Sequence, residues 1–284
     1  MPISFRSLTY IYDEGMPYAH TALKDIDLDI REGVITAVIG ETGSGKSTLV
    51  EHLNALLLPS KGSLEILDHT IVAKEKNKNL KALRREVGLV FQFSEYQLFE
   101  ETILKDVAFG PKNFGVEEKE AEKKAAEALK MVGIDESLFS NSPLDLSGGQ
   151  KRRVAIAGIL AIDPKIIVLD EPTAGLDPSG ADEMTALFVS MNRKMGKTII
   201  IVSHDNEMVY SYADDTVVVK KGEIAYHGPT VDLFSDRQKM EELDILEPQI
   251  VTVRHLLLEN GFPIKPEDRT LEEIIARAAK EIRR

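Results

Sequence analysis

Residues 40–48 read Gly-Glu-Thr-Gly-Ser-Gly-Lys-Ser-Thr, and they directly follow the aliphatic run at residues 34–39. A buried strand, a glycine-rich turn and then a helix form the context in which such a segment wraps around a polyphosphate. The glycines allow the backbone to adopt positive φ and to approach a ligand closely. The backbone N–H groups and the start of the helix then face the anion with partial positive charge. The chain is therefore constrained to an α/β fold built around a P-loop.

The polar side chains of this loop predict a bound nucleoside triphosphate. Lys46 is placed to reach the β- and γ-phosphates, and Ser47 is placed to put its hydroxyl on Mg²⁺. We expect ATP and Mg²⁺ as the ligands. The residues expected to contact the nucleotide here are Gly40, Glu41, Thr42, Gly43, Ser44, Gly45, Lys46, Ser47 and Thr48.

Composition excludes several other classes of protein. The 284 residues contain no cysteine, so disulfides, thiolate catalysis and cysteine metal sites are ruled out. The formal net charge of −12 argues against direct electrostatic docking on nucleic acid or anionic lipid. No apolar stretch is long enough to span a bilayer, and the first residues predict no secretory signal. We expect neither a nucleic-acid partner nor a lipid anchor.

Short aliphatic runs predict a largely parallel sheet that is covered on both faces. These runs lie at residues 87–91, 166–169 and 198–202, whereas residues 25–30 alternate as a half-buried strand does and residues 216–226 indicate a hairpin. Helices are expected after the P-loop at residues 48–58 and at residues 117–132, where Ala121, Ala125, Leu129 and Val132 form one apolar stripe.

The character of the chain changes from about Asp236, because strand signals stop there. One helix is expected at residues 251–260, and a capping box of Thr270 and Glu273 predicts the start of another. Its apolar stripe must pack on the main domain or on a partner chain, and it consists of Leu271, Ile274, Ile275, Ala278 and Ile282. We expect residues 1–235 to form the main domain and residues 236–284 a small helical appendage.

Two carboxylates follow the run at residues 166–169. Asp170 is suited to hold Mg²⁺ through water opposite Ser47, and Glu171 is suited to polarise an attacking water as a general base. Two acids at the end of a strand are common on protein surfaces. With a P-loop upstream, they instead predict nucleotide hydrolysis.

A third motif lies between these two, at Leu146, Ser147, Gly148, Gly149 and Gln150. With it the chain resembles the ATP-binding cassette family over about residues 1–235. The resemblance implies a mixed sheet core, an antiparallel β subdomain and a helical subdomain at about residues 93–160. It also implies that this signature segment caps the γ-phosphate of ATP held by the P-loop of a second subunit. A hydroxyl, two close N–H donors and a helix N-terminus suit that role.

Other positions match the same family one by one. Gln92 matches the Q-loop glutamine, a ligand of Mg²⁺ and water, and Asp177 lies in the segment at residues 175–178 that matches the D-loop along the dimer interface. His204 matches the switch histidine that contacts the γ-phosphate. Tyr12 matches the aromatic residue that stacks on adenine, with Tyr10 as the competing choice. The resemblance implies an active ATPase with Glu171, His204, Lys46 and Gln92 in catalysis.

The remaining question is what the ATPase drives. Members of this family that act in DNA repair or chromosome structure carry a long coiled coil between the Q-loop and the signature, whereas the stretch from Gln92 to Leu146 leaves no room for one here. Members that act in translation fuse two cassettes in one chain, and this chain has one. A transporter motor is therefore favoured. Residues 93–111 resemble the ATPase subunits of energy-coupling factor transporters, importers of vitamins and transition metals, and the Gln-Leu-Phe at residues 97–99 resembles the second of two paralogous ATPases. The alternative is a homodimeric ATPase of an ordinary importer.

The resemblance to energy-coupling factor transporters implies a set of partners. These are a paralogous ATPase in a heterodimer, a transmembrane T subunit and a membrane-embedded S subunit that binds the substrate, at the cytoplasmic face of the cell membrane. Glu95, Glu100 and Glu101 would put carboxylates around the groove that receives the T subunit, where a basic residue could pair with one of them. The alternative is that these carboxylates are simply solvated.

Overall fold

The computed structural model describes residues 3–77, 79–265 and 267–282. Its central sheet has six strands in the order β10-β9-β3-β8-β7-β6. The five strands from β9 to β6 run parallel, and β10 adds an antiparallel edge. The strands are β3 (Ile35–Ile39), β6 (Val87–Val90), β7 (Ile166–Asp170), β8 (Thr198–Val202), β9 (Asp215–Lys220) and β10 (Glu223–Pro229). The parallel strands expected from the aliphatic runs are confirmed.

Alternate residues of the central strands enter two separate hydrophobic cores. Along β7, Ile167 and Leu169 join one core, whereas Ile166 and Val168 join the other. Successive side chains of a strand point to opposite faces of its sheet, so an unbroken aliphatic run is what a sheet covered on both faces requires. Packing on both faces thereby holds β7 in place, so Asp170 at its carboxyl end and Glu171 directly after it stand on a rigid support.

A second, antiparallel sheet covers one face, in the order β2-β1-β4-β5. Its strands are β1 (Ile3–Tyr12), β2 (His20–Ile30), β4 (Lys61–Ile66) and β5 (His69–Val72). Helix α1 (Lys46–Glu51) packs Leu49 and Val50 into the core shared by the two sheets. The helix expected at residues 48–58 is shorter than predicted, because the regular helix ends at Glu51, turns follow it, and Ala55 adopts a φ of 54°.

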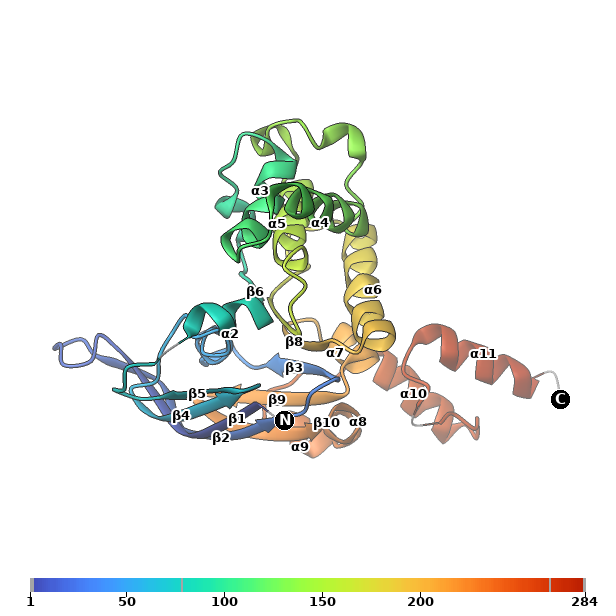
Figure 1. The fold of residues 1–284 in the computed structure, drawn as a ribbon. Helices are drawn as coiled ribbons and strands as arrows, with labels where there is room; N and C mark the ends of the chain where they lie inside the picture. Colours follow the sequence, from blue (N-terminus) through green and yellow to red (C-terminus); the bar gives the residue numbers. More distant parts are fainter. Residues whose placement is uncertain (1–2, 78, 266, 283–284) are drawn as a thin grey trace.

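A helical subdomain lies at one end of the molecule (Figure 1). It contains the 3₁₀ turn η1 (Ser94–Gln97) and the helices α3 (Ile103–Asn113), α4 (Glu118–Met131) and α5 (Gly148–Leu160), with short 3₁₀ turns η2 (Glu136–Leu138) and η3 (Pro143–Asp145) between α4 and α5. The predicted stripe of α4 is confirmed: Ala121, Ala125, Leu129 and Val132 are all buried. Helix α2 (Leu80–Glu86) precedes β6 outside this subdomain.

The other helices flank the sheet and lead into the C-terminal appendage. They are α6 (Pro178–Met195), α7 (Asn206–Tyr212) and α8 (Thr230–Ser235), followed by α9 (Arg237–Glu242), α10 (Gln249–Glu259) and α11 (Leu271–Ile282). The break at Asp236 between α8 and α9 coincides with the expected start of the appendage. Figure 1 shows α10 and α11 beside α7. Among the helices of the described residues, none is long and apolar enough to cross a membrane.

The appendage shares the core of the main domain. Ile250, Val251, Ile264 and Ile274 all belong to the core cluster that covers one face of the central sheet. Only part of the predicted stripe of α11 is used in this way, since Leu271 and Ile275 remain about half exposed. The side chain of Ile282 lies outside the described residues. The appendage is therefore anchored through α10, through the segment before α11 and through one edge of α11.

Candidate nucleotide-binding site

The turn between β3 and α1 requires glycine at two positions. Gly40 has a φ of 144°, and a Cβ there would lie 2.2 Å from the carbonyl oxygen of Val219. Gly45 has a φ of 109°, and a Cβ there would lie 2.8 Å from the carbonyl oxygen of Ala22. Both the backbone conformation and the close packing exclude a side chain. The loop is therefore held in a wrapped shape by its own neighbours.

Lys46 is buried at the centre of this loop. Its ammonium donates hydrogen bonds of 2.8 Å to the backbone carbonyls of Gly40 and Glu41. Burial lowers the pKa of Lys46, while the nearby carboxylates of Glu171 and Asp170 act in the opposite direction. A buried ammonium that is held by carbonyl oxygens alone is incompletely compensated. An incoming phosphate would supply the missing counter-charge.

A cavity of about 260 Å³ opens beside the loop. It is lined by Tyr12, His20, Ala22, Gly43, Gly45, Lys46, Ser47 and Thr48. The Tyr12 hydroxyl lies 3.1 Å from Oγ1 of Thr48, which fixes the ring at the rim. Tyr10 instead packs edge-to-face against His52 and Tyr12 and does not line the cavity. The geometry thus favours Tyr12 as the adenine-stacking residue.

The two acids at the carboxyl end of β7, Asp170 as its last residue and Glu171 directly after it, differ in their surroundings. Asp170 is 6% exposed, and burial raises its pKa, although a hydrogen bond from Ser47 and the charge of Lys46 act against the shift. A buried carboxylate beside a hydroxyl matches the oxygen ligands that Mg²⁺ prefers. Among the described residues, no group of three or more His, Asp or Glu side chains is placed to hold a metal ion, so a metal ion here would depend on substrate phosphates for further ligands. The donor set fits Mg²⁺ bound together with ATP.

Glu171 is held in an unusual backbone conformation. Its φ is 50°, and its N–H donates a 3.1 Å hydrogen bond to the carbonyl of Val202 at the end of β8. Burial raises the pKa of Glu171, and the nearby His204 is the main influence that lowers it. Oε1 of Glu171 lies 3.4 Å from Nε2 of His204 and has no hydrogen-bond partner among the described residues. The structure thus brings together the residues expected as base and switch.

Gln92 follows β6 and is exposed, and its backbone carbonyl accepts a hydrogen bond from Arg152 of α5. Arg152 is 4% exposed, and its Nε also lies 3.4 Å from Oε2 of Glu95. A Cβ on Gly175 would lie 3.9 Å from the same guanidinium. Arg152 therefore joins two segments, the Q-loop and the turn η1, and its guanidinium lies near Gly175 of the D-loop. In the sequence, Arg152 is one of three consecutive basic residues at positions 151–153, and no local pattern marks it for a role.

The signature segment lies away from the cavity of the P-loop. Ser147 caps α5 in a capping box: its Oγ accepts from the N–H of Gln150, and its own N–H donates to Oε1 of Gln150. Leu146 is buried, whereas Ser147 and Gly148 are exposed. None of these residues lines the P-loop cavity. Asp177 is also exposed and caps α6 through the N–H of Gly180. The chain presents its signature to the outside.

The chain is similar to proteins of a known family. Residues 23–174, more than half of the chain, match the family model described as ABC transporter. The chain is 50% identical to the energy-coupling factor transporter ATP-binding protein EcfA2 of Streptococcus pneumoniae, over 96% of this chain and 98% of that protein. It is 44% identical to the protein of the same name from Enterococcus faecalis, over 99% and 98% of the two chains.

The chain belongs to the energy-coupling factor transporter ATP-binding proteins of the EcfA2 type. It is thus an ATPase of the ABC transporter family and part of a transporter complex.

Solved structures show the same fold. The cassette MJ0796, in a dimeric post-hydrolysis state bound to ADP and Pi, is 32% identical with a TM-score of 0.72, over 80% of this chain and 98% of that chain. The protein cbiO1 from Clostridium perfringens, part of the ABC transporter complex cbiONQ, is 38% identical with a TM-score of 0.71, over 89% and 98%. The ABC-type fold expected from the motifs is confirmed.

Two features of the site escaped the sequence analysis. His20 and Ala22 line the cavity from β2, far from the P-loop in sequence, and no local pattern marks them. His52, which directly follows the P-loop helix as its C-cap, is fully buried and donates from Nδ1 to the carbonyl of Thr48. An isolated histidine after an apolar pair gives no sign of such burial. Only the tertiary packing reveals these contributions.

Proposed function

We propose that this EcfA2-type ATPase pairs with a paralogous ATPase and drives a transmembrane T subunit together with a membrane-embedded S subunit. The proposed transporter imports vitamins or transition-metal ions, and the chain acts at the cytoplasmic face of the cell membrane without crossing it. ATP with Mg²⁺ would be clamped between the P-loop of one ATPase and the signature segment of the other. Closure and reopening of this pair would move the T subunit.

The observation that carries this proposal is the unused surface of the signature segment. A Cβ built on Gly148 meets no atom within 4 Å, so nothing in the part of the chain that the structure describes requires glycine there. Among the described residues, the N–H groups of Gly148 and Gly149 donate no hydrogen bond, and the capping box leaves the Ser147 hydroxyl proton uncommitted. Close backbone approach by an anion explains both features, and the chain's own P-loop cavity lies elsewhere.

The charged and polar residues of the nucleotide site would have separate roles in ATP hydrolysis. Lys46 would neutralise the β- and γ-phosphates, and Glu171 would accept the proton of the attacking water. His204 would contact the γ-phosphate from beside Glu171. Ser47, Asp170 and Gln92 would hold Mg²⁺, which neutralises developing charge on the phosphate oxygens when bound.

An exposed aromatic surface supports docking of a membrane partner. Phe93 and Tyr96 lie in and beside η1, with exposed fractions of 58% and 84%, and their ring centroids are 6.3 Å apart. Phe99 and Phe109 pack edge-to-face nearby and are also largely exposed. Large aromatic side chains are the residues that dominate protein–protein contacts when a partner covers them. The position beside the Q-loop connects this surface with the nucleotide site through Arg152.

The three acids of this region are not equivalent. Glu95 contacts the buried Arg152, and Glu101 forms an exposed ion pair of 2.9 Å with Lys105. The carboxylate of Glu100 has no hydrogen bond or ion pair among the described residues. Glu100 is therefore the acid best suited to pair with a basic residue of the T subunit.

Reversal of the charge at this position tests the docking surface. Glu100→Lys should lower co-purification of the T subunit by about tenfold, the scale of a lost charge pair at an interface. Binding of ATP should be unchanged, because Glu100 is remote from the cavity. The matched control is Glu136→Lys, which reverses an exposed acid paired with Lys130 elsewhere in the helical subdomain. Equal T-subunit recovery from both variants would refute the assignment of Glu100.

Mass measurement of the purified complex, with identification of each subunit, tests the proposed function itself. We expect this chain, one different ATPase, a T subunit and an S subunit. Two copies of this chain on an ordinary importer would contradict the heterodimer, and a complex without membrane subunits would contradict the transport role.

A further inference from the structure

Helix α7 begins two residues after the candidate switch His204. Asp205 caps it, since Oδ1 accepts hydrogen bonds from the N–H groups of Glu207 at 3.0 Å and Met208 at 3.1 Å. The helix has only seven residues. So short a helix is unstable by itself in water, and its orientation depends on tertiary contacts. Whatever holds α7 therefore sets where His204 lies.

The C-terminal appendage holds the far end of α7 through Arg269. Its Nε donates a 2.7 Å hydrogen bond to the carbonyl of Tyr210, and one terminal nitrogen donates to the carbonyls of Tyr210 and Ala213. The guanidinium also lies over the ring of Tyr210, with 5.6 Å between its central carbon and the ring centroid. A cation at the carbonyl end of a helix is favoured by the helix dipole.

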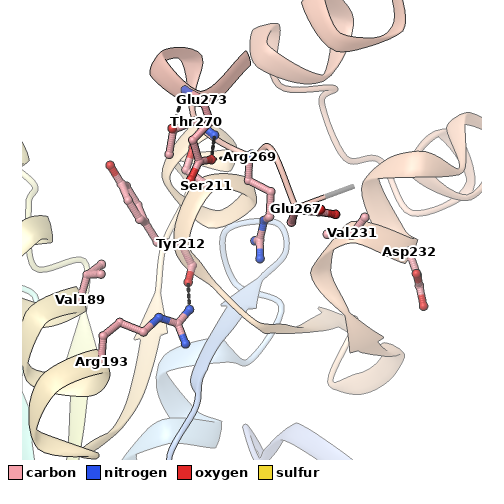
Figure 2. Close-up of a pocket in the computed structure, with 10 residues that line it drawn as sticks. All are labelled: Val189, Arg193, Ser211, Tyr212, Val231, Asp232, Glu267, Arg269, Thr270 and Glu273. Carbon is pink, nitrogen blue, oxygen red and sulfur yellow. Dashed lines mark hydrogen bonds between the residues drawn. The ribbon is translucent and has the colours of Figure 1, made fainter. Parts of the chain in front are cut away.

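Arg269 lines a cavity of about 630 Å³ between the main domain and the appendage (Figure 2). Figure 2 shows two arginines that approach the end of α7 from different elements: Arg269 precedes α11, and Arg193 of α6 reaches the carbonyl of Tyr212. Arg193 also forms an ion pair with Asp214, which follows α7. The main domain and the appendage thus both form hydrogen bonds with the same end of α7.

The appendage also holds the near end of α7. The Glu207 carboxylate accepts hydrogen bonds from the N–H groups of Gln249 and Ile250 at the start of α10. Asn206 donates from Nδ2 to the carbonyl of Leu246 at 2.8 Å. Contacts that only attach the appendage could lie anywhere on the main domain. These contacts instead converge on both ends of the one helix that follows His204.

We infer that the appendage positions His204 of its own chain by clamping α7, and that Arg269 is the principal positioning residue. This inference rests on the role of His204 in the proposed function. Loosening of the clamp would allow α7 to turn and would move His204 away from Glu171, whose Oε1 lies 3.4 Å from its Nε2. None of the described appendage residues lines the P-loop cavity, so the clamp acts on turnover and not on ATP binding.

Steady-state ATPase measurements on the full chain, purified within its transporter complex, test this inference. Arg269→Ala should lower kcat about three- to tenfold with an unchanged KM for ATP, the usual size of an effect transmitted through intervening structure. Arg269→Lys should be intermediate, because an ammonium lacks the planar fork that reaches two carbonyls. The control is Arg237→Ala, which removes an appendage guanidinium that contacts Glu247 and His255 instead of α7. This control should keep the wild-type kcat, and an equal loss in it would overturn the inference.

A double-mutant cycle with His204→Ala distinguishes positioning from a general loss of structure. In single-turnover reactions, Arg269→Ala should add no further slowing once His204 is absent, since both act through one side chain. Independent, multiplicative slowing would overturn the inference and leave the role of His204 intact. Wild-type turnover of His204→Ala alone would instead remove that role, and the inference with it.

The dimer interface is the other place where the appendage could act. With Glu171→Gln as background, ATP should produce the same amount of closed dimer whether residue 269 is arginine or alanine. Loss of the closed dimer on Arg269→Ala would place the effect at the interface and overturn the inference.

Discussion

The buried imidazole of His52 makes the nucleotide site sensitive to acid. Because the carbonyl oxygen of Thr48 can only accept, Nδ1 of His52 must carry the proton in the 2.7 Å hydrogen bond between them. Nε2 is buried and has no partner among the described residues. Burial lowers the pKa of His52 from 6.5 to about 4. Protonation would place a cation with no partner directly behind the P-loop helix.

The magnitude follows from linkage between proton binding and folding. The unfolded chain binds the His52 proton near pH 6.5 and the folded chain only near pH 4, so the free energy of unfolding falls as the pH drops between these values. A tenfold change in proton affinity is worth ~1.4 kcal/mol. The change in the pKa of His52 from 6.5 to about 4 therefore limits the total loss in the free energy of unfolding to about 3 kcal/mol. About 2 kcal/mol of this should be lost between pH 7 and pH 4.5.

Urea denaturation of wild type and His52→Gln at the two pH values measures this loss. Glutamine can still donate to the Thr48 carbonyl but does not titrate, so the variant should lose about 2 kcal/mol less than wild type on acidification. The control is His227→Gln, which removes an exposed histidine of β10 and should lose as much free energy of unfolding as wild type on acidification. The same acid-induced loss in His52→Gln and wild type would refute the reasoning.

Two further predictions concern the chemistry of the site. Glu171→Gln should keep ATP binding while kcat falls by about 10² to 10⁴, the usual contribution of a general base, as measured by phosphate release; a kcat within about threefold of wild type would contradict the assignment of the base. Lys46→Ala should weaken ATP binding about ten- to a hundredfold in calorimetry, the scale of a lost charge-assisted hydrogen bond, and unchanged affinity would contradict its place in the phosphate cradle.

Local patterns predicted the parts of this protein that depend on neighbours in sequence. The apolar runs of β7 and β8 are buried on both faces, and the stripe of α4 is buried as predicted. The length of α1 was wrong, because the turn after Glu51 is set by packing that the sequence does not display. Arg84, for example, donates to the carbonyls of Asn54 and Ala55 from 29 or more residues away.

The parts that sequence reasoning missed depend on contacts between distant segments. Arg152 is one of three consecutive basic residues, a pattern that gives no sign of burial, yet it is buried between the Q-loop and η1. Arg269 stands in a polar stretch of the tail, yet it reaches back more than fifty residues to the end of α7. Long cationic side chains give no periodic signal, and their partners here are backbone carbonyls, which every residue possesses.

The charged groups of the nucleotide site are held in a state that favours ligand binding over stability. Burial lowers the pKa of Lys46 and raises the pKa of both Asp170 and Glu171, so burial opposes the charged form of all three groups. Without ligand, their ionised forms therefore cost stability at neutral pH. A bound triphosphate supplies anions for Lys46, and a divalent cation supplies positive charge for Asp170. Relief of this cost adds to the binding free energy, because desolvation of the protein charges occurred when the chain folded.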